Sequence, residues 1–511
     1  MKLKAVLLGY ESGQYTILID DTVAQKLDVR PHDRVKVSHD GKEIIAIVTV
    51  AKHFPEDSIG LYDNVAKALE VKDGDIVSVK VAEPPPSIKI IRKKLSRARL
   101  TPEEARQLIS DIVEGKISEI ELTALVTALH FQGITVEEAL NFTMAMVETG
   151  ERFRLNKRPI LDKHSLGGVP GDKTSLLVVP IIASLGYTIP KTSSRAITSA
   201  AGTADRMEVL APVNLSVEEM KKVVEKTNGC IVWGGSLRLA PADDIIIRVE
   251  YPLGIDPFFV PSILAKKLAV GSTHVVLDIP TGRGTKARTL EEARRIARDF
   301  IDIGGRLGIN LVAVATYGEE PVGHAVGPAL EAREALRALT TLQPKDVVDK
   351  AVSVAGVLLE MVGIYNGREV ALQALKTGKA EKKLREIIEA QGGDPNVKID
   401  DIPVGDKRFT LYAEDEGFVF MIDNTAIALA GKTAGAPHDK GAGVYVHVKL
   451  GDKVKRGDPL LTVYAESSVK LQAAEKLIME SSPIRISRLV GRRMLLEKIE
   501  LGVGRAVYLE R

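Results

Sequence analysis

Hydrophobic positions in the first 83 residues follow one pattern twice. Residues 17–37 align without a gap on residues 59–79; both copies have Ile-x-Leu/Ile-x-Asp-x-Val-Ala-x-x-Leu-x-Val, a turn, and Asp-x-Val-x-Val. The alternating apolar residues predict strands, and the Val-Ala-x-x-Leu spacing predicts a short helix between them. Repeats this small bury a core by packing against each other. We therefore predict one domain over residues 1–83. Because catalytic residue types do not cluster in it, we expect a role in assembly.

The pattern becomes helical after Pro84-Pro85-Pro86, because successive prolines interrupt both helices and strand pairing. Thr101 precedes a proline and two glutamates, which is the signature of a helix start. Apolar residues at helical spacing then predict helices over residues 117–131 and 136–149. We expect a compact helical domain over residues 87–157, together with part of residues 240–272.

From residue 158 onward, short apolar runs alternate with helical stretches. This alternation predicts a mostly parallel sheet that binds ligands beyond the carboxyl ends of its strands. We assign residues 158–393 to this α/β domain. The predicted strands are 160–163, 188–191, 231–233, 274–278 and 310–316, and the predicted helices are 175–185, 217–226, 290–307, 329–339 and 345–361.

Residues 394–511 change character again and are predicted to form a separate α+β domain. The predicted strands are 444–450, 460–464, 469–471 and 506–509. Residues 451–460 have the glycine and proline pattern of a hairpin corner. The whole chain is therefore predicted to be a multidomain α/β protein.

The strongest candidate for chemistry is the segment from Asp162 to Ser175, Asp-Lys-His-Ser-Leu-Gly-Gly-Val-Pro-Gly-Asp-Lys-Thr-Ser, which leads into a predicted helix. Glycines let backbone N–H groups approach a ligand, and a helix start adds unpaired donors. Lys163 and Lys173 add positive charge, so the segment predicts an anion site, first of all for phosphate. The alternative is a structural turn in which Asp172 caps the helix; the lysines and hydroxyls together favour phosphate.

Two further polar segments follow predicted strands. Residues 192–203 combine hydroxyl side chains with Arg195, a set that suits an oxyanion; alone, the segment could equally be a serine-rich loop or a helix cap. Gly282-Arg283-Gly284-Thr285-Lys286 is another candidate anion loop. Two anion loops on one sheet suit a substrate that carries its own phosphate, bound together with free phosphate.

Residues 256–266 hold a weaker set of candidates. Asp256 precedes a proline at a predicted helix start, where it could act only as an N-cap. Ser262 and Lys266 are four residues apart and share a helix face, which is usually a solvated face. These residues indicate a functional site only if they lie next to the phosphate segment.

Composition excludes several classes of protein. The 511 residues carry a net charge of +2, which argues against nucleic acid as a partner, and 45% are hydrophobic, enough for several cores. Cys230 is the single cysteine, so an intramolecular disulfide and a cysteine-built zinc site are excluded. Gly431-Lys432-Thr433 ends like a Walker A loop, but Ala426 replaces its first glycine, so ATP hydrolysis is not expected. We find neither a signal peptide nor a membrane segment, and expect a cytoplasmic protein, with a composition that fits a thermophile.

The spaced motifs resemble one family. Lys163-His164-Ser165-x-Gly167-Gly168, followed by Thr174-Ser175, is similar to the signature of the thymidine and pyrimidine-nucleoside phosphorylase superfamily. Residues 193–203, 262–269, 326–331 and the C-terminal hairpin resemble the same family, so the similarity runs from about residue 87 to the end. Residues 1–83 resemble a double-psi β-barrel. This barrel, Pro170 in the phosphate segment and the hydroxyl-rich 194–199 segment are similar to the archaeal AMP phosphorylases.

The resemblance implies a nucleoside phosphorylase type II fold and a set of site residues. Asp256 would be the catalytic residue that donates a proton to the leaving base. His164 and Lys266 would orient the substrate. The nucleotide would be bound by Gly168, Ser194, Arg195, Ala196, Ile197, Thr198, Ser199, Thr203, Ser262 and Lys286, and the attacking phosphate by Lys163, Ser165, Ser175 and Ser193, with Thr203 shared between the two sites.

The implied reaction is phosphorolysis of nucleoside 5′-monophosphates, AMP and also CMP and UMP, to free base and α-D-ribose 1,5-bisphosphate. It would serve nucleotide degradation or salvage in a homodimer or larger homo-oligomer, with phosphate as co-substrate and without a metal or cofactor. A thymidine or pyrimidine-nucleoside phosphorylase is the alternative enzyme. A non-catalytic assembly module is a third possibility, which the intact Lys163-His164-Ser165 loop argues against.

Overall fold

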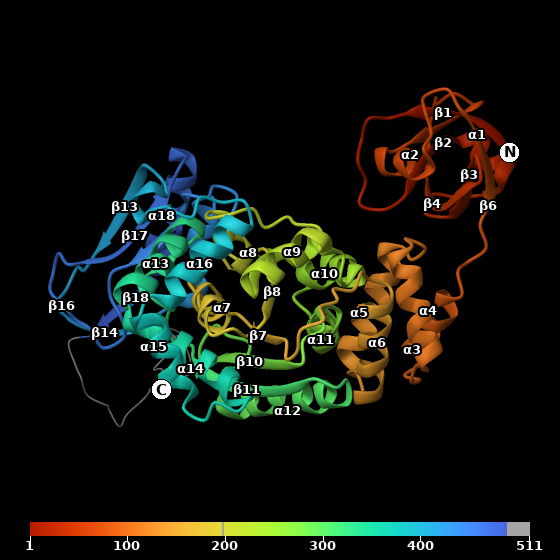
Figure 1. The fold of residues 1–511 in the computed structure, drawn as a ribbon. Coiled ribbons are helices and arrows are strands. Elements are labelled where there is room, and N and C mark those ends of the chain that lie inside the picture. Colours follow the sequence, from red (N-terminus) through yellow and green to blue (C-terminus); the bar gives the residue numbers. More distant parts are fainter. Residues whose placement is uncertain (197–198, 488–511) are drawn as a thin grey trace, which may run out of the picture.

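The computed structural model describes residues 1–196 and 199–487, which form four units in chain order (Figure 1). The barrel lies at one end, the helical unit next to it, the α/β unit in the middle and the C-terminal unit at the far end. None of the helices in these residues is long and apolar enough to cross a lipid bilayer. The predicted strand 506–509 lies outside the described residues.

Residues 1–83 form a closed six-stranded barrel, which confirms that the two repeats pack on each other. Its order is β1-β5-β2-β4-β3-β6, and the repeated units are β2-α1-β3 and β5-α2-β6. Equivalent residues of the repeats, such as Ile17 and Ile59, are both fully buried in one core. The elements are β1 Lys2–Leu7, β2 Thr16–Asp20, α1 Asp21–Leu27, β3 Arg34–His39, β4 Lys42–Ala51, β5 Ser58–Leu61, α2 Asp63–Leu69 and β6 Ile76–Val81.

The barrel contacts the helical unit through two arginines. Arg34 of β3 donates from Nε to the Lys116 carbonyl at 3.1 Å and forms a salt bridge with Glu121. Arg248 donates to the Gly13 carbonyl at 3.3 Å. These contacts seat the barrel on the helical unit, at the opposite end of the molecule from the C-terminal unit (Figure 1).

Six helices share the core of the helical unit, and two of them come from far along the chain. Ala242, Ile246 and Ala265 pack into the same core as residues 90–147. Three of the helices begin with a capping box, at Thr101 for α4 and at corresponding positions of α5 and α6. The helices are α3 Ser87–Leu95, α4 Pro102–Val113, α5 Glu119–Gln132, α6 Val136–Glu148, α10 Pro241–Leu253 and α11 Phe259–Val270.

A buried ion pair joins α3 to α6. Lys94 Nζ lies 2.6 Å from Glu138 Oε1, and the two side chains are 4% and 2% exposed. Glu138 Oε1 also accepts the backbone N–H of Leu100 at 3.2 Å. Removing the lysine would leave a charged carboxylate in the protein interior without its partner.

We therefore expect Lys94→Met to lower the free energy of unfolding of the helical unit by about 3–5 kcal/mol. Lys93→Met is the matched control, because the neighbouring Lys93–Glu104 pair is partly exposed and its loss should change stability by about 0–1 kcal/mol. Denaturant unfolding followed by circular dichroism measures both. Equal losses in the two variants would contradict the assignment of a buried pair.

The α/β unit is built on parallel strands, as predicted. One sheet has the order β11-β10-β7 and a second pairs β8 with β9, all in parallel. A parallel bridge between Ile160 and Thr188 connects the two sheets. All five predicted strands occur, as β7 Leu161–Ser165, β8 Ile189–Ser193, β9 Gly229–Trp233, β10 His274–Thr281 and β11 Asn310–Tyr317.

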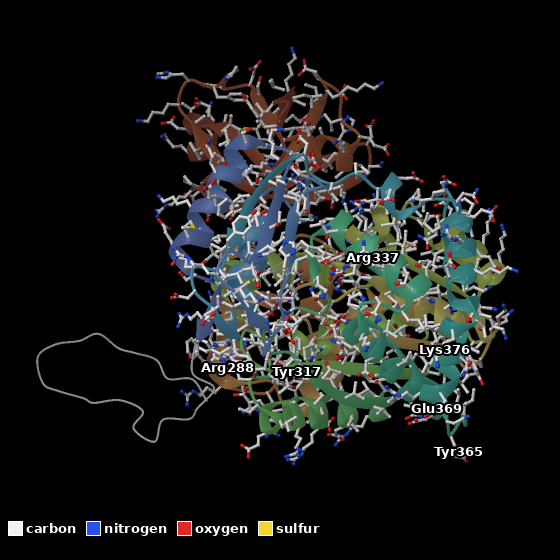
Figure 2. All side chains as sticks on the ribbon, turned by 90° about the vertical axis from the view of Figure 1, so that its left-hand side faces the viewer. Arg288, Tyr317, Arg337, Tyr365, Glu369 and Lys376 are labelled. Carbon is white, nitrogen blue, oxygen red and sulfur yellow. The ribbon has the colours of Figure 1, made fainter. Side chains whose placement is uncertain are left out.

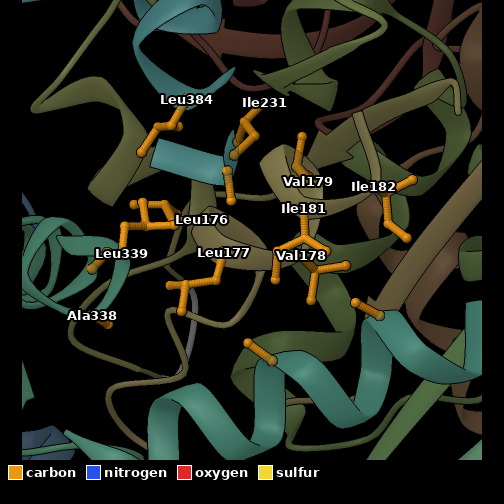
Figure 3. Close-up of a cluster of buried hydrophobic side chains, with 14 of the residues drawn as sticks. Leu176, Leu177, Val178, Val179, Ile181, Ile182, Ile231, Ala338, Leu339 and Leu384 are labelled. Carbon is orange, nitrogen blue, oxygen red and sulfur yellow. The ribbon is translucent and has the colours of Figure 1, made fainter. Parts of the chain in front are cut away.

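Helices surround these strands and hold the phosphate segment in place. Every residue of α7 from Ser175 to Ala183 is buried, and its apolar side chains pack against Ile231, Leu339 and Leu384 (Figure 3). Phe300 of α12 packs in a separate cluster with residues of α6, α11 and β10. The helices are α7 Ser175–Ser184, α8 Thr203–Glu208, α9 Val217–Thr227, α12 Leu290–Arg306, α13 Pro328–Thr341, α14 Lys345–Glu360, α15 Gly367–Lys376 and α16 Lys379–Ala390, with 3₁₀ turns Gly234–Leu237 and Ile399–Asp401.

Charged side chains extend outward from all four units (Figure 2). The turn between α14 and α15 carries Tyr365, which is 94% exposed, and the labelled Glu369 and Lys376 of α15 lie at the same side of the molecule (Figure 2). The chain carries 70 lysine and arginine residues and 68 aspartate and glutamate residues, which accounts for the small net charge.

The C-terminal unit contains two sheets, with orders β12-β15-β17-β13 and β16-β14-β18. The predicted strand 469–471 is wrong, because these residues belong to helix α18. Leu471, Ala474 and Ile478 pack at helical spacing on the core, and three residues were too few to distinguish this pattern from alternation. The elements are β12 Ala325–Val326, β13 Lys407–Tyr412, β14 Gly417–Ile422, α17 Asn424–Thr433, β15 Gly443–Val446, β16 Lys453–Val454, β17 Pro459–Ala465, α18 Ser468–Ser481 and β18 Ile484–Ser487.

Candidate active site

The segment from Asp162 to Ser175, which we call the phosphate loop, connects the carboxyl end of β7 to the start of α7. Lys163 is 2% exposed, and its Nζ lies 3.8 Å from Asp172 Oδ2 and 3.6 Å from Asp278 Oδ2. Ser165 Oγ donates to Asp172 Oδ2 at 3.0 Å. Ser175 opens the helix that ends the loop. The loop therefore gathers a cation, a hydroxyl and a helix N-terminus around Asp172.

Two cations that the sequence did not single out also reach this loop. Lys350 of α14 places its Nζ 3.3 Å from Asp172 Oδ2 and 3.1 Å from Asp278 Oδ2. Arg206 of α8 donates to the Asp172 carbonyl and, at 3.3 Å, to Thr203 Oγ1. Arg206 thus joins the phosphate loop to residues 193–203. Its position three residues after Thr203 was a usable signal, whereas Lys350 lies in a helix about 180 residues away from the loop in sequence.

The electrostatics of the loop keep Asp172 charged. Burial would raise the pKa of Asp172, but the charges of Lys163 and Lys350 outweigh it and hold that pKa well below its usual value. Burial lowers the pKa of Lys350, but the charges of Asp172 and Asp278 outweigh this effect and raise that pKa. A phosphate entering the loop would therefore meet two charged lysines that are already oriented by carboxylates.

His164 is surrounded by lysines. Desolvation and then the charges of Lys267 and Lys191 lower the pKa of His164 well below its usual value, so the imidazole is neutral. Lys267 itself is bound to Asp162 at 2.8 Å beneath the loop. A neutral imidazole offers one N–H donor and one acceptor nitrogen, which fits the expected orienting role.

The segment 193–203 follows β8 and is held by carboxylates. Arg195 donates to Asp205 Oδ1 at 3.1 Å and to Glu208 Oε1 at 2.6 Å, and its guanidinium lies 5.0 Å from the Trp233 ring. The backbone N–H of Ala196 donates to Asp205 Oδ2 at 2.7 Å. Asp205 and Glu208 therefore hold the Arg195 guanidinium against the segment.

Two hydroxyls of this segment have local partners. Ser193 Oγ donates to the Ser194 carbonyl at 3.2 Å, and Ser199 Oγ donates to the Ala201 carbonyl at 3.0 Å. Two expected nucleotide-binding residues, Ile197 and Thr198, lie outside the described residues.

Gly168 brings the phosphate loop against the loop 282–286. Its φ is +88°, and a Cβ there would lie 2.7 Å from Thr285 Cα, so both the conformation and the space require glycine. Lys286, next to Thr285, donates from Nζ to Asp256 Oδ2 at 2.7 Å. The two anion loops and the expected proton donor are therefore physically connected.

Asp256 does not cap a helix. Phe258 occupies the N-cap position of α11, and Lys286 lies between Asp256 and the Phe259 ring, 3.9 Å from the ring centroid. Nearby Glu250 accepts the Phe258 N–H at 3.1 Å. Burial and then the charge of Asp256 raise the pKa of Glu250 to about 8, so Glu250 holds a proton at neutral pH.

Ser262 and Lys266 occupy different surroundings on α11. Ser262 Oγ is buried and lacks a hydrogen-bond partner within residues 1–196 and 199–487, as expected of a hydroxyl whose partner is a bound ligand. Lys266 forms a salt bridge with Asp243 of α10. This salt bridge links α11 to α10 within the helical unit.

Three family models match the chain beyond the barrel. Family models match at residues 88–150, the helical bundle domain of a glycosyl transferase family, at 157–381, its a/b domain, and at 418–485, the C-terminal domain of pyrimidine nucleoside phosphorylases. AMP phosphorylase of Thermofilum pendens is 66% identical over 511 residues, which is 100% of both chains. AMP phosphorylase of Thermococcus kodakarensis is 48% identical over 97% of this chain and 99% of that protein.

The chain belongs to the AMP phosphorylase family. AMP phosphorylase 1 of Archaeoglobus fulgidus is a further relative, 47% identical over 96% of this chain and 98% of that protein. Among solved structures, anthranilate phosphoribosyltransferase from Thermus thermophilus covers 59% of this chain and 98% of its own, with a TM-score of 0.48 and 20% identity. The phosphorylase relatives extend over the barrel as well as the other three units, so all four units belong to the family architecture.

Within this AMP phosphorylase fold, the contacts connect the separate sequence motifs. Gly168 and Thr285 join the phosphate loop to loop 282–286, Lys286 joins that loop to Asp256, and Arg206 joins the phosphate loop to Thr203. Sequence reasoning missed Lys350, Arg206 and Asp278. Lys350 and Asp278 act through other side chains, and Lys350 lies on a helix whose own sequence carries no anion-binding pattern. Arg206 lies on the helix that Thr203 begins, so its position in the sequence was a usable signal.

Proposed function

We propose that this chain transfers the ribosyl 5-phosphate group of a nucleoside 5′-monophosphate, AMP above all and also CMP and UMP, to inorganic phosphate. The products are the free base and α-D-ribose 1,5-bisphosphate. The observation that carries the proposal is the connection of two anion-binding segments with the Asp256–Lys286 pair through Gly168, Thr285 and Arg206. The relatives that share the full length of this chain are AMP phosphorylases.

The reaction breaks the bond between C1′ of the ribose and a ring nitrogen of the base. An oxygen of inorganic phosphate, held by Lys163, Ser165, Ser175 and Ser193, forms the new bond to C1′. The electron pair of the broken bond goes to the base, which accepts a proton from Asp256. Phosphate is the second substrate, and this exchange of one bond for another needs no cofactor.

Asp256 must carry a proton when the base leaves, and Lys286, which donates to its carboxylate at 2.7 Å, favours the ionised form instead. The same contact stabilises the anion once the proton has been transferred. Glu250 accepts the backbone N–H of Phe258, two residues after Asp256. Because its pKa is raised to about 8, Glu250 holds a proton near Asp256 at neutral pH. Neutral His164 orients the ribose or the phosphate at the end of β7.

Measuring phosphate-dependent release of base from AMP, CMP, UMP and thymidine tests the proposal. We expect base to be released from AMP only when phosphate is present, and ribose 1,5-bisphosphate to form in equal amount. Release from thymidine without release from AMP would overturn the proposal. It would favour a pyrimidine-nucleoside phosphorylase, the second candidate, which the match of residues 418–485 supports.

We also propose that the barrel, of the double-psi kind, controls assembly of a homodimer or larger homo-oligomer. The repeat relates the parallel pairs β1·β5 and β4·β2, and Arg34 and Arg248 join the barrel to the helical unit. Deleting residues 1–83 should lower the mass measured by light scattering and change kcat per subunit much less. An unchanged ratio of oligomer mass to subunit mass would contradict this role.

A further inference from the structure

Lys173 of the phosphate loop is fully buried. Its Nζ donates to the Val322 carbonyl at 2.7 Å, to the Ala325 carbonyl at 3.1 Å and to Glu334 Oε2. An ammonium group has three N–H donors, and these three acceptors use all of them. The sequence assigned the charge of Lys173 to the anion, but the structure places it against helix α13 and residues 320–326, which we call the bridging segment.

The backbone of the phosphate loop is fixed to the same segment. The Val322 N–H donates to the Pro170 carbonyl at 3.1 Å. Gly171 has a φ of +72°, and a Cβ there would lie 2.7 Å from the carbonyl oxygens of both Val322 and Ala325. Residues 170–173 therefore pack directly on the bridging segment, at a distance that only glycine permits.

Helix α13 supplies two buried carboxylates about one turn apart, and each holds a cation that reaches the loop. Glu334 pairs with Lys173, and Glu331 Oε2 lies 2.9 Å from Nε of Arg206, which donates to the Asp172 carbonyl. Burial would raise the pKa of Glu334, but the charge of Lys173 outweighs it and holds that pKa below its usual value. Asp172 is therefore fixed at its own carbonyl and at the next residue of the chain.

The bridging segment is also held by the C-terminal unit. Its strand β12 pairs antiparallel with β15, where Ala325 lies opposite Tyr445. Lys449 Nζ donates to the Pro321 carbonyl at 2.6 Å. The phosphate loop thus rests on a segment that belongs to the sheet of another unit.

We propose that Lys173 is a positioning residue for the attacking phosphate. By fixing the loop to the bridging segment and α13, it sets the position of its neighbour Asp172. The Asp172 carboxylate in turn lies beside Lys163 and accepts from Ser165, the two residues of β7 that are assigned to phosphate. The inference rests on the proposed function above, because it takes inorganic phosphate as the ligand of the loop.

A role in stability alone makes a different prediction. The Lys94–Glu138 pair of the helical unit is as well buried as the Lys173–Glu334 pair, with side chains 4% and 2% exposed against 0% and 3%. If both pairs act on stability alone, Lys94→Met and Lys173→Met should each lower the melting temperature and leave the kinetics with phosphate unchanged. A positioning role changes those kinetics in Lys173→Met only.

The test compares Lys173→Met, Lys94→Met and the combination of Lys173→Met with Glu334→Gln in the full-length protein. The combination removes both charges, so that neither is left buried without its partner. The glutamine amide oxygen can still accept the His324 N–H, as Glu334 does at 3.1 Å. We measure the melting temperature, kcat/KM for phosphate at saturating AMP, KM for AMP, and binding of inorganic phosphate by calorimetry.

For Lys173→Met we expect kcat/KM for phosphate to fall by about 10–100-fold, because a displacement of about 1 Å in a binding group has an effect of this size. KM for AMP should change less, since most residues assigned to the nucleotide follow β8 rather than β7. The combined variant should regain melting temperature without regaining kcat/KM for phosphate. Lys94→Met should lose melting temperature only.

Three results would overturn the proposal: an unchanged kcat/KM for phosphate in Lys173→Met, its recovery in the combined variant, or an equal loss in Lys94→Met. If Lys173→Met does not fold, the kinetics of the combined variant decide. An unmodified protein that binds phosphate but leaves AMP intact would refute the proposed function alone. The affinity of the variants for phosphate, measured by calorimetry, would then test the positioning role.

Discussion

Replacing Asp256 by asparagine is expected to lower kcat for AMP by about 10²–10⁴-fold, the usual contribution of general acid catalysis. The amide keeps the shape of the carboxyl group but cannot transfer a proton to the departing base. Its oxygen still accepts from Lys286, which lies 2.7 Å away in the unmodified protein, so the local structure should survive. AMP affinity measured by calorimetry should change little.

Asp299→Asn is a matched control for this variant. Asp299 lines the same cavity of about 290 Å³ as Asp256 but belongs to α12, and its replacement should leave kcat nearly unchanged. A nucleotide whose base leaves readily without protonation should lose much less activity in Asp256→Asn than AMP does. Near-normal turnover of AMP by Asp256→Asn would remove Asp256 from the mechanism.

Adenosine is expected to react with a kcat/KM lower than that of AMP by orders of magnitude. In the proposed site the 5′-phosphate has donors of its own, and a substrate without that phosphate forgoes those hydrogen bonds. A hydrogen bond to a charged group contributes about 1.5–3 kcal/mol, so two or three such bonds account for the discrimination. Steady-state rates for both substrates at the same phosphate concentration measure it.

The segment after β8 is the place to change this preference. Replacing both Ser194 and Ser199 with alanine should bring kcat/KM for AMP closer to that for adenosine. AMP then loses hydroxyl contacts that adenosine does not use. Ser184→Ala at the end of α7 is the control, since Ser184 Oγ bonds only the Ile181 carbonyl within the described residues. Equal kcat/KM for AMP and adenosine in the unmodified protein would overturn the nucleotide assignment.

The sequence by itself determined the elements and their order where the local signal was long or repeated. The duplicated pattern that places Ile17 and Ile59 in equivalent positions was sufficient to predict one barrel core, because neither copy can bury its apolar face alone. Capping residues such as Thr101 marked helix starts to within a residue. Glycine and lysine in the phosphate loop indicated an anion site, because backbone approach and charge depend on residue type rather than on distant contacts.

Only the tertiary structure decided which side chains meet. The sequence assigned part of residues 240–272 to the helical unit, but only the fold shows that Ala242, Ile246 and Ala265 pack into the core of residues 90–147. Residues 469–471 become helical because Ala474 and Ile478 pack on the C-terminal core.

The tertiary structure also decides which charged side chains meet around the site. Lys350 reaches Asp172 across 178 residues of chain, and Lys173 reaches Glu334 across 161. Arg195, which the sequence assigned to the nucleotide, is held by Asp205 and Glu208. A charged side chain binds whichever partner the fold brings within a few ångströms, and sequence spacing reports that distance only within a single helix or turn.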